Sequence, residues 1–283
     1  MATPNKGDAD DTVFTGSAER FGYEWGEYAE LRPEYEEQFR RWTVLLPPVE
    51  WRNKTFLDIG CGMGRNAYWA ASWGATEGLA IDIDDRSLAS ARQTLAKFPQ
   101  VAVEKRSAYE IGERDRFDIV FSIGVIHHLA DPAAALRGMF GAVRPGGRVL
   151  IWVYGLENNG WIVTFLNPLR KALFSKLPIA LVHHLSLYPA AALWLGLRLG
   201  IGRTAYFKLR RQWTFRQLRS VVFDQMLPRI ANYWAKADVD QLMRDCGLQQ
   251  VELSWVNEMS WCAVGRKPLR HEETRRISKA SSK

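Results

Sequence analysis

Residues 57–66 read LDIGCGMGRN, and this stretch decides the fold that the sequence predicts. A short apolar run leads into three glycines, Gly60, Gly62 and Gly64, and a helical pattern follows them. Glycine lets the backbone approach a ligand closely, and the start of a helix offers free N–H groups. A dinucleotide fingerprint, G-x-G-x-x-G, would place its third glycine at position 65, which is Arg65. The turn therefore predicts a ligand site that differs from a nicotinamide site.

Strand and helix patterns alternate on both sides of this turn. The expected strands are 55–60, 76–84, 101–106, 117–124, 148–155, 248–256 and 260–267. The expected helices are 66–74, 86–98, 132–143 and 236–247, with further helices over 17–46. Such alternation predicts an α/β fold with a mostly parallel sheet between two layers of helices. The last two strand patterns are close in the sequence, so we expect them to pair antiparallel.

The motif D-x-G-x-G-x-G at 58–64 resembles motif I of the class I S-adenosylmethionine-dependent methyltransferases. Three later segments resemble further motifs of this family in the same order. They are GLAIDID (78–84), FDIVFSIGVIHHLADP (117–132) and RPGGRVLI (144–151). The resemblance covers about 55–155 and points to the small-molecule branch. It implies a Rossmann-like, seven-stranded, mostly parallel sheet with an antiparallel last strand, and S-adenosylmethionine as the cofactor.

The resemblance also implies which residues bind that cofactor. Asp82 would accept hydrogen bonds from both ribose hydroxyls, and Ile83 would lie against the adenine. Family members usually carry an Asp after the third strand that receives the adenine amino group. Ser107 stands at that place here, so we expect Ser107 or the Ala108 backbone to take this part. The complete expected set is Asp58, Gly60, Cys61, Gly62, Gly64, Asp82, Ile83, Ser107, Ala108, Ser122, Ile123 and Gly124.

Methyl transfer at a sulfonium carbon mostly requires alignment and exclusion of water. A general base is needed only when the acceptor loses a proton. His127 and His128 are the nearest candidate bases, although the pair also fits a packing role at a strand end. We expect Tyr23 or Trp25 to touch the cofactor or the substrate. The aromatic segments 223–234 and 255–261 could line an acceptor pocket or simply pack as loops.

A basic, apolar segment interrupts the α/β pattern at 156–232. No Asp or Glu occurs from 158 to 223, although the whole chain has a net charge of only +7. The basic residues of that window are Arg170, Lys171, Lys176, Arg198, Arg203, Lys208, Arg210, Arg211, Arg216 and Arg219. Residues 177–197 are long and apolar enough to span a membrane. Pro178 and Pro189 interrupt them, however, and the strands that follow must return to the same sheet.

We therefore expect this segment to form a helical insert that covers the acceptor site as a lid. Apolar ridges beside Arg and Lys would also suit an anionic membrane surface, through 158–223. Simple packing of the helices on the sheet is the plainer alternative. The expected division of the chain is 1–15 and 269–283 as disordered tails, 16–155 and 233–268 as the methyltransferase domain, and 156–232 as the insert.

The sequence leaves several functions open. A small, hydrophobic or lipid-linked acceptor fits best. An RNA methyltransferase that holds phosphates with its basic insert is the alternative, although we do not expect a nucleic-acid partner. A non-enzymatic module is disfavoured because Asp58, Asp82 and the glycines are all present. Three scattered cysteines and no leader pattern predict a cytoplasmic protein, or one at the inner membrane surface, without a metal site.

Overall fold

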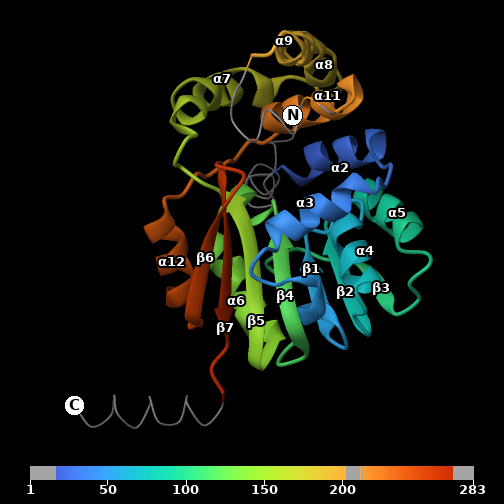
Figure 1. Cartoon of the computed structure of the whole chain (residues 1–283), viewed down its shortest axis with the longest axis vertical. Helices are drawn as coiled ribbons and strands as arrows, with labels where there is room; N and C mark the ends of the chain where they lie inside the picture. Colours follow the sequence, from blue (N-terminus) through green and yellow to red (C-terminus); the bar gives the residue numbers. More distant parts are fainter. Residues whose placement is uncertain (1–16, 202–210, 212, 270–283) are drawn as a thin grey trace, which may run out of the picture.

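Seven strands form one mixed sheet in the order β3-β2-β1-β4-β5-β7-β6 (Figure 1). The computed structural model describes residues 17–201, 211 and 213–269. The strands are β1 Thr55–Ile59, β2 Glu77–Asp82, β3 Val101–Lys105, β4 Phe117–Ile123, β5 Val143–Tyr154, β6 Gln249–Val256 and β7 Ser260–Arg266. The first five run parallel, and β7 lies antiparallel to both β5 and β6. The predicted fold class is therefore confirmed.

Helices cover both faces of this sheet, and each face has its own apolar core (Figure 1). One core involves α3 Glu34–Trp42, η1 Pro48–Trp51, α4 Arg65–Ser72 and α5 Asp85–Thr94. The other involves η2 Ile126–His128, α6 Pro132–Ala142 and α12 Lys236–Asp245. The side chains of Asp84 and Asp131 accept backbone N–H bonds at the starts of α5 and α6. They satisfy donors that would otherwise be unpaired, which fixes where both helices begin.

The strand order reverses between β1 and β4, and this reversal positions the site. The connection after β1 leads toward β2, whereas the connection after β4 leads toward β5. Because the two connections diverge, a crevice remains at the carboxyl ends of the two strands. β4 is buried along its whole length, so this crevice lies over the centre of the molecule.

The segment between β5 and α12 folds mainly into helices, which we call the helical cap (156–232). Its described elements are η3 Ile162–Leu166, α7 Asn167–Ala172, η4 Phe174–Lys176, α8 Ile179–Leu185, α9 Leu187–Arg198 and α11 Phe215–Met226. Pro168 and Pro189 lie in the first turns of α7 and α9, and Pro178 directly precedes α8. Proline is tolerated there because those N–H groups have no partner within the helix.

The N-terminal helix α2, Ala18–Glu27, packs against the helical cap (Figure 1). Buried Arg20 donates hydrogen bonds to the carbonyl oxygens of Leu227 and Phe174, both at 2.8 Å, and of Leu177 at 3.2 Å. An apolar cluster around Val182 of α8 and Phe223 of α11 fills the contact. These bonds join the start of the described chain to segments 154 to 207 residues later.

One helical stretch, Ile179–Arg198, could cross a membrane by length and composition alone. In the structure it comprises α8 and α9, and most of it is not buried inside the protein. The strands on either side of it pair with each other, with Trp152 of β5 opposite Cys262 of β7. A crossing would put these two strands on opposite sides of the membrane, so the fold argues against a span.

Candidate active site

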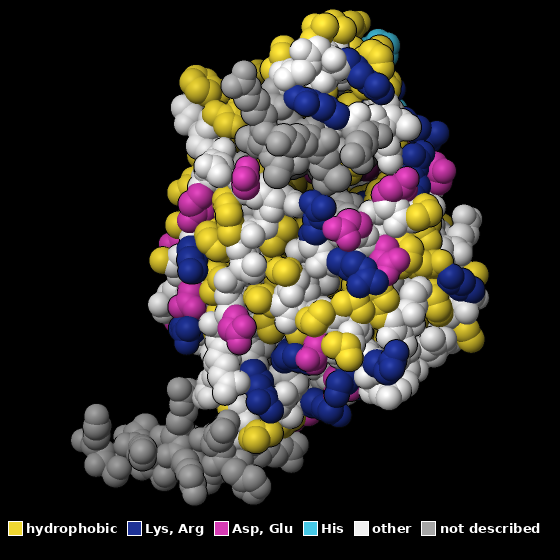
Figure 2. Space-filling view, in the orientation of Figure 1, with side chains coloured by type: hydrophobic (Ala, Val, Ile, Leu, Met, Phe, Trp, Pro, Cys, Tyr) yellow, Lys and Arg dark blue, Asp and Glu magenta, His cyan; other side chains and the backbone are white. Residues whose placement is uncertain are grey.

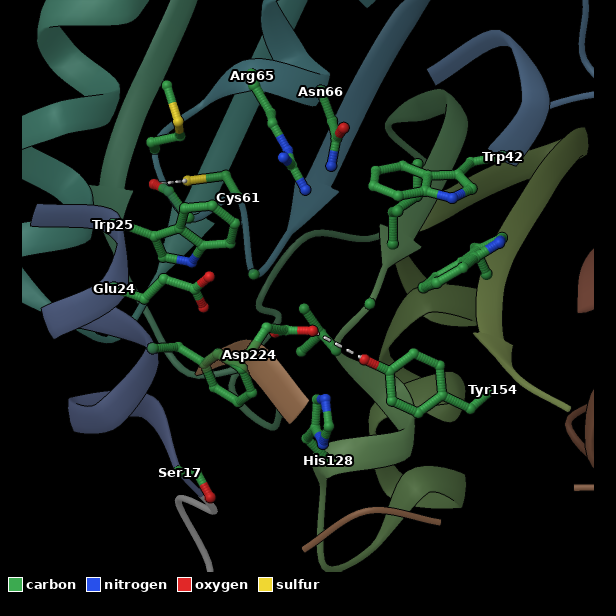
Figure 3. A pocket seen from close by; sticks show the side chains of 18 of the residues that line it. Ser17, Glu24, Trp25, Trp42, Cys61, Arg65, Asn66, His128, Tyr154 and Asp224 are labelled. Atoms are coloured by element: carbon green, nitrogen blue, oxygen red, sulfur yellow. Dashed lines mark hydrogen bonds between the residues drawn. The ribbon is translucent and has the colours of Figure 1, made fainter. Parts of the chain in front are cut away.

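A cavity lies at the carboxyl ends of β1, β2 and β4, under α2 and α11 (Figure 3). Its floor is the glycine turn after β1 together with the residues that end β2 and β4. Its walls come from segments far apart in the sequence: α2, α3, the start of the helical cap, α11 and the β6–β7 hairpin. The reversal of strand order opens the crevice, and the cap and α2 turn it into a pocket.

The backbone of the glycine turn packs so closely against its neighbours that a side chain would not fit at Gly60 or Gly62. Gly60 and Gly62 have φ angles of +71° and +55°. A Cβ on Gly60 would lie 2.4 Å from a methyl group of Val125, and one on Gly62 would lie 2.8 Å from the indole nitrogen of Trp25. The backbone itself therefore forms the floor of the cavity at this point. Trp25 lines the cavity as expected, whereas Tyr23 lies against His183 in the helical cap.

Asp82 ends β2 with its carboxylate held in place by the backbone. Its Oδ2 accepts a bond from Gly62 N–H at 2.9 Å, and its Oδ1 accepts one from Asp84 N–H at 3.0 Å. Burial raises the pKa of this carboxyl group. The carboxylate lies beside Ile83 at the cavity wall, where it can accept further hydrogen bonds from a diol.

Most of the expected cofactor residues meet at this cavity. Those that line it are Gly60, Cys61, Gly62, Asp82, Ile83, Ser107, Ala108, Ile123 and Gly124.

Asp58, Gly64 and Ser122 do not line it. Asp58 is fully buried under the turn, and burial raises its pKa. The Ser122 hydroxyl donates to the carbonyl oxygen of Ile59 at 2.9 Å, which ties β4 to β1. Gly64 precedes α4 and packs close to Ala91 of α5. The geometry of these three positions supports the turn from beneath.

The two adjacent histidines occupy different environments. Nδ1 of His128 lies 2.7 Å from the carbonyl oxygen of Ile230, so this nitrogen carries the proton and donates it. Nε2 is then an unprotonated acceptor, and the His128 side chain lines the cavity (Figure 3). Burial lowers its pKa to about 3. His127 is fully buried, does not line the cavity and packs 3.9 Å from Tyr154, measured between ring centroids.

Two acidic residues that no sequence motif singled out face the same cavity. Glu24 of α2 is buried, and it accepts a bond from the Ser220 hydroxyl at 3.0 Å. Its other oxygen, Oε2, has no partner among the described residues. Asp224 of α11 accepts a bond from the Tyr154 hydroxyl at 3.2 Å (Figure 3). Burial raises the pKa of both carboxyl groups.

Arg65 provides a positive charge across the cavity from these acids (Figure 3). Its guanidinium lies over the rings of Trp25, Tyr35 and Trp42, at 4.9, 5.1 and 5.2 Å from the centroids. Aromatic faces stabilise such a cation without neutralising it. Among the described residues Arg65 makes no ion pair within 4.0 Å, although its charge lowers the pKa of Glu24. With Glu24 ionised, the two opposite charges would be complementary to a zwitterion.

The two aromatic segments expected near the acceptor do contribute to the cavity. Asp224, Gln225 and Tyr233 come from the first segment, and Asn257 and Met259 come from the second. Asp224 is also the first acidic residue after the acid-free window, a signal that the sequence contained. Within 17–201, 211 and 213–269, no group of three His, Cys, Asp or Glu side chains is placed to hold a metal ion.

Comparison with known proteins identifies the central part of the chain. Residues 57–151 match a family model described as a methyltransferase domain. A tRNA U34 carboxymethyltransferase of Pseudoalteromonas translucida is 31% identical over 123 residues, which are 42% of this chain and 38% of the relative. A ubiquinone biosynthesis O-methyltransferase of Pseudomonas putida is 30% identical over 128 residues, 44% of this chain and 55% of the relative. The chain thus spans about half or less of the length of these relatives.

Structural similarity to known proteins extends beyond residues 57–151. A protein of Pyrococcus horikoshii superposes with a TM-score of 0.53 at 16% identity, covering 83% of this chain and 92% of that one. The family match falls on the glycine turn, Asp82 and the end of β4, which form the floor of the cavity. The cofactor of this family, S-adenosylmethionine, fits the charges and hydrogen-bond acceptors found there. Residues 57–151 therefore form a methyltransferase domain, as the resemblance to the class I S-adenosylmethionine-dependent methyltransferases implied.

Proposed function

We propose that this chain transfers a methyl group from S-adenosylmethionine to a small, hydrophobic or lipid-linked acceptor bound under the helical cap. One observation carries the proposal. A single cavity joins the residues suited to the cofactor, Gly62 and Asp82, to polar groups on the cap side, His128, Tyr154 and Asp224. A methyl donor and an acceptor could therefore meet inside one enclosed space.

The cofactor has three polar parts, and the cavity has a partner for each. Asp82 would accept hydrogen bonds from the ribose hydroxyls. Arg65 would bind the carboxylate of the methionine part, and the unpartnered Oε2 of Glu24 would accept from its ammonium group. When bound, the cofactor would supply a methyl group on a sulfonium, and the neutral thioether left behind is a good leaving group. The protein's own contribution is alignment and the exclusion of water by α2 and the cap.

His128 is the residue best suited to take a proton from the acceptor. Its Nδ1–H is fixed by the Ile230 carbonyl, so Nε2 can accept a proton from an O–H or N–H group. Burial keeps the ring neutral, which is the form that can accept a proton. The same burial lowers its pKa to about 3, so His128 would be a weak base that needs direct contact with the acceptor. His127 lacks this access and serves as packing behind Tyr154.

The character of the cavity favours a small acceptor over RNA. Trp152, Ile162 and Met259 supply apolar surface, whereas Glu24 and Asp224 place acidic groups on the wall. Phosphates would lose their water on entering such a buried cavity, and RNA would bring them in number. The curated relatives include both a tRNA-modifying enzyme and a ubiquinone-pathway enzyme, so the acceptor class must be measured.

The test is to follow the methyl group. The purified chain is incubated with methyl-labelled S-adenosylmethionine and a cell extract, which is then separated into lipid, aqueous small-molecule and RNA fractions. We expect label in the lipid or small-molecule fraction. The matched control is an Asp82→Ala chain, which should add little label beyond that of the extract alone. Label that stays in the RNA fraction and is released by ribonuclease would refute a small acceptor.

A further inference from the structure

The helical cap leaves one apolar stripe uncovered on the helix that runs through η3 and α7. Trp161, Phe165, Leu169 and Leu173 are all exposed, and Phe165 is exposed by 73%. They follow one another at intervals of four residues, so they lie along one side of the helix. Solvent-facing helix sides are normally polar, and this one is the reverse.

A second uncovered stripe lies on α9. Ala190 and Leu197 face inward and are buried, whereas Tyr188, Leu195 and Leu199 are exposed, Leu199 by 71%. The exposed residues are spaced by seven and four, which again places them on one side. Figure 2 shows hydrophobic side chains gathered over the cap at this end of the molecule. Exposed apolar surface of this extent indicates a binding face.

The charges around these stripes are all of one sign. Lys171 of α7, Lys176 of η4 and Arg198 of α9 are exposed, and none pairs with a carboxylate among the described residues. No acidic residue occurs between 158 and 223. Apolar side chains flanked by Lys and Arg match the two layers of an anionic bilayer surface, its acyl boundary and its head groups.

We propose that the helical cap docks on an anionic lipid bilayer, with the stripes of η3–α7 and α9 inserted at its surface. A second copy of the chain fits this surface less well. In a symmetric dimer the same patch meets itself, so the unpaired cations would face one another. A nucleic acid would satisfy the cations but would leave Phe165 and Leu195 against a charged backbone.

The docked orientation would bring the bilayer close to the active site. Asn159 and Ile162 line the cavity, whereas their helix neighbours Trp161 and Phe165 face outward. One helix therefore separates the cavity from the proposed bilayer surface, which suits a lipid-linked acceptor. That last step rests on the proposed function, whereas docking itself does not.

The experiment measures binding of the whole chain to two kinds of vesicle, without any acceptor. One kind contains phosphatidylcholine alone, and the other contains phosphatidylcholine with phosphatidylglycerol. We expect the chain to sediment with the second kind and much less with the first. Phe165→Ser together with Leu195→Ser should weaken binding by at least about tenfold, because apolar contact is lost. Lys171→Gln and Lys176→Gln should each weaken it by roughly fivefold.

A matched control distinguishes vesicle binding through the helical cap from binding through any exposed apolar residue. Val49 is exposed by 70% but lies in η1, away from the cap, so Val49→Ser should leave vesicle binding unchanged. Calorimetric binding of S-adenosylmethionine shows that each variant is folded. Equal binding to both vesicles, or none to either, would overturn the proposal. So would a dimer that Phe165→Ser and Leu195→Ser dissociate. The vesicle experiment does not measure methyl transfer. Docking could therefore be confirmed even if the proposed function were wrong.

Discussion

The Asp82 carboxylate is already oriented before any ligand binds. Two backbone N–H groups already hold the carboxylate, so little ordering remains when a diol binds. Asp82→Ala should lower the affinity for S-adenosylmethionine by about ten- to a hundredfold, the size expected for lost charged hydrogen bonds. Calorimetry measures this. Asp85→Ala, at an exposed position three residues later, is the control and should change nothing. An affinity equal to that of the unaltered chain would remove the ribose assignment.

His128 makes a prediction about stability and pH. Burial lowers its pKa from 6.5 to about 3 in the folded chain, so between these values the unfolded chain binds more protons. Its contribution is therefore fully present above pH 6.5 and is lost as the pH falls. Relative to His128→Asn, the unaltered chain should lose about 2 kcal/mol of unfolding free energy between pH 8 and pH 5. Denaturant titrations at both values measure it. A difference that stays constant would contradict the burial of a neutral ring.

At the residue scale, the orientation of single side chains could not be predicted from the sequence. His127 and His128 are adjacent in a short helical turn, so their side chains point in different directions, and only contacts show which one faces the cavity. Asp58 and Ser122 lie at or near strand ends, where side chains alternate between directions. The glycine turn could be predicted because its neighbours in the chain determine it, whereas the role of Asp82 was implied by the resemblance to the family.

At the scale of elements, the site depends on the packing of α2 against the helical cap. Glu24 lies on α2 and Asp224 lies on α11, and the 3.0 Å bond from Ser220 of α11 to Glu24 joins the two helices. No local pattern links residues two hundred positions apart, so the sequence could not show that Glu24 and Asp224 face one cavity. The strands and flanking helices were predictable, because a period of two or 3.6 is a local property.

Arg20 allows this packing to be tested. Its guanidinium donates to four carbonyl oxygens, whereas the amide of a Gln at this position could donate to at most two. Arg20→Gln should lower the unfolding free energy by about 2 kcal/mol, and hydrogen exchange should quicken in α2 and α11 before it does in the sheet. Arg41→Gln removes only an exposed ion pair with Glu37 and should cost less than about 0.5 kcal/mol. Equal exchange in sheet and cap would contradict the role of Arg20.

At the scale of the whole molecule, the cavity and the outer surface of the helical cap differ in chemical character. Its carboxyl edge forms the cavity, and the helical cap above that edge presents apolar and basic side chains outward (Figures 1 and 2). The sequence showed that the cap was both apolar and free of acids. Which of its apolar residues were covered could not be predicted, because a helix that is apolar all round has no obvious inner side.

The pairing of β5 with β7 also affects how the chain is made. β5 ends at Tyr154, and its partner begins only at Ser260. At ordinary rates of translation, roughly 5 to 20 seconds pass before the ribosome has added the intervening residues. Until then the nascent chain carries β5 as an open strand edge, with its backbone groups free to pair with another chain. Completion of the sheet must therefore wait until almost the whole chain has been synthesised.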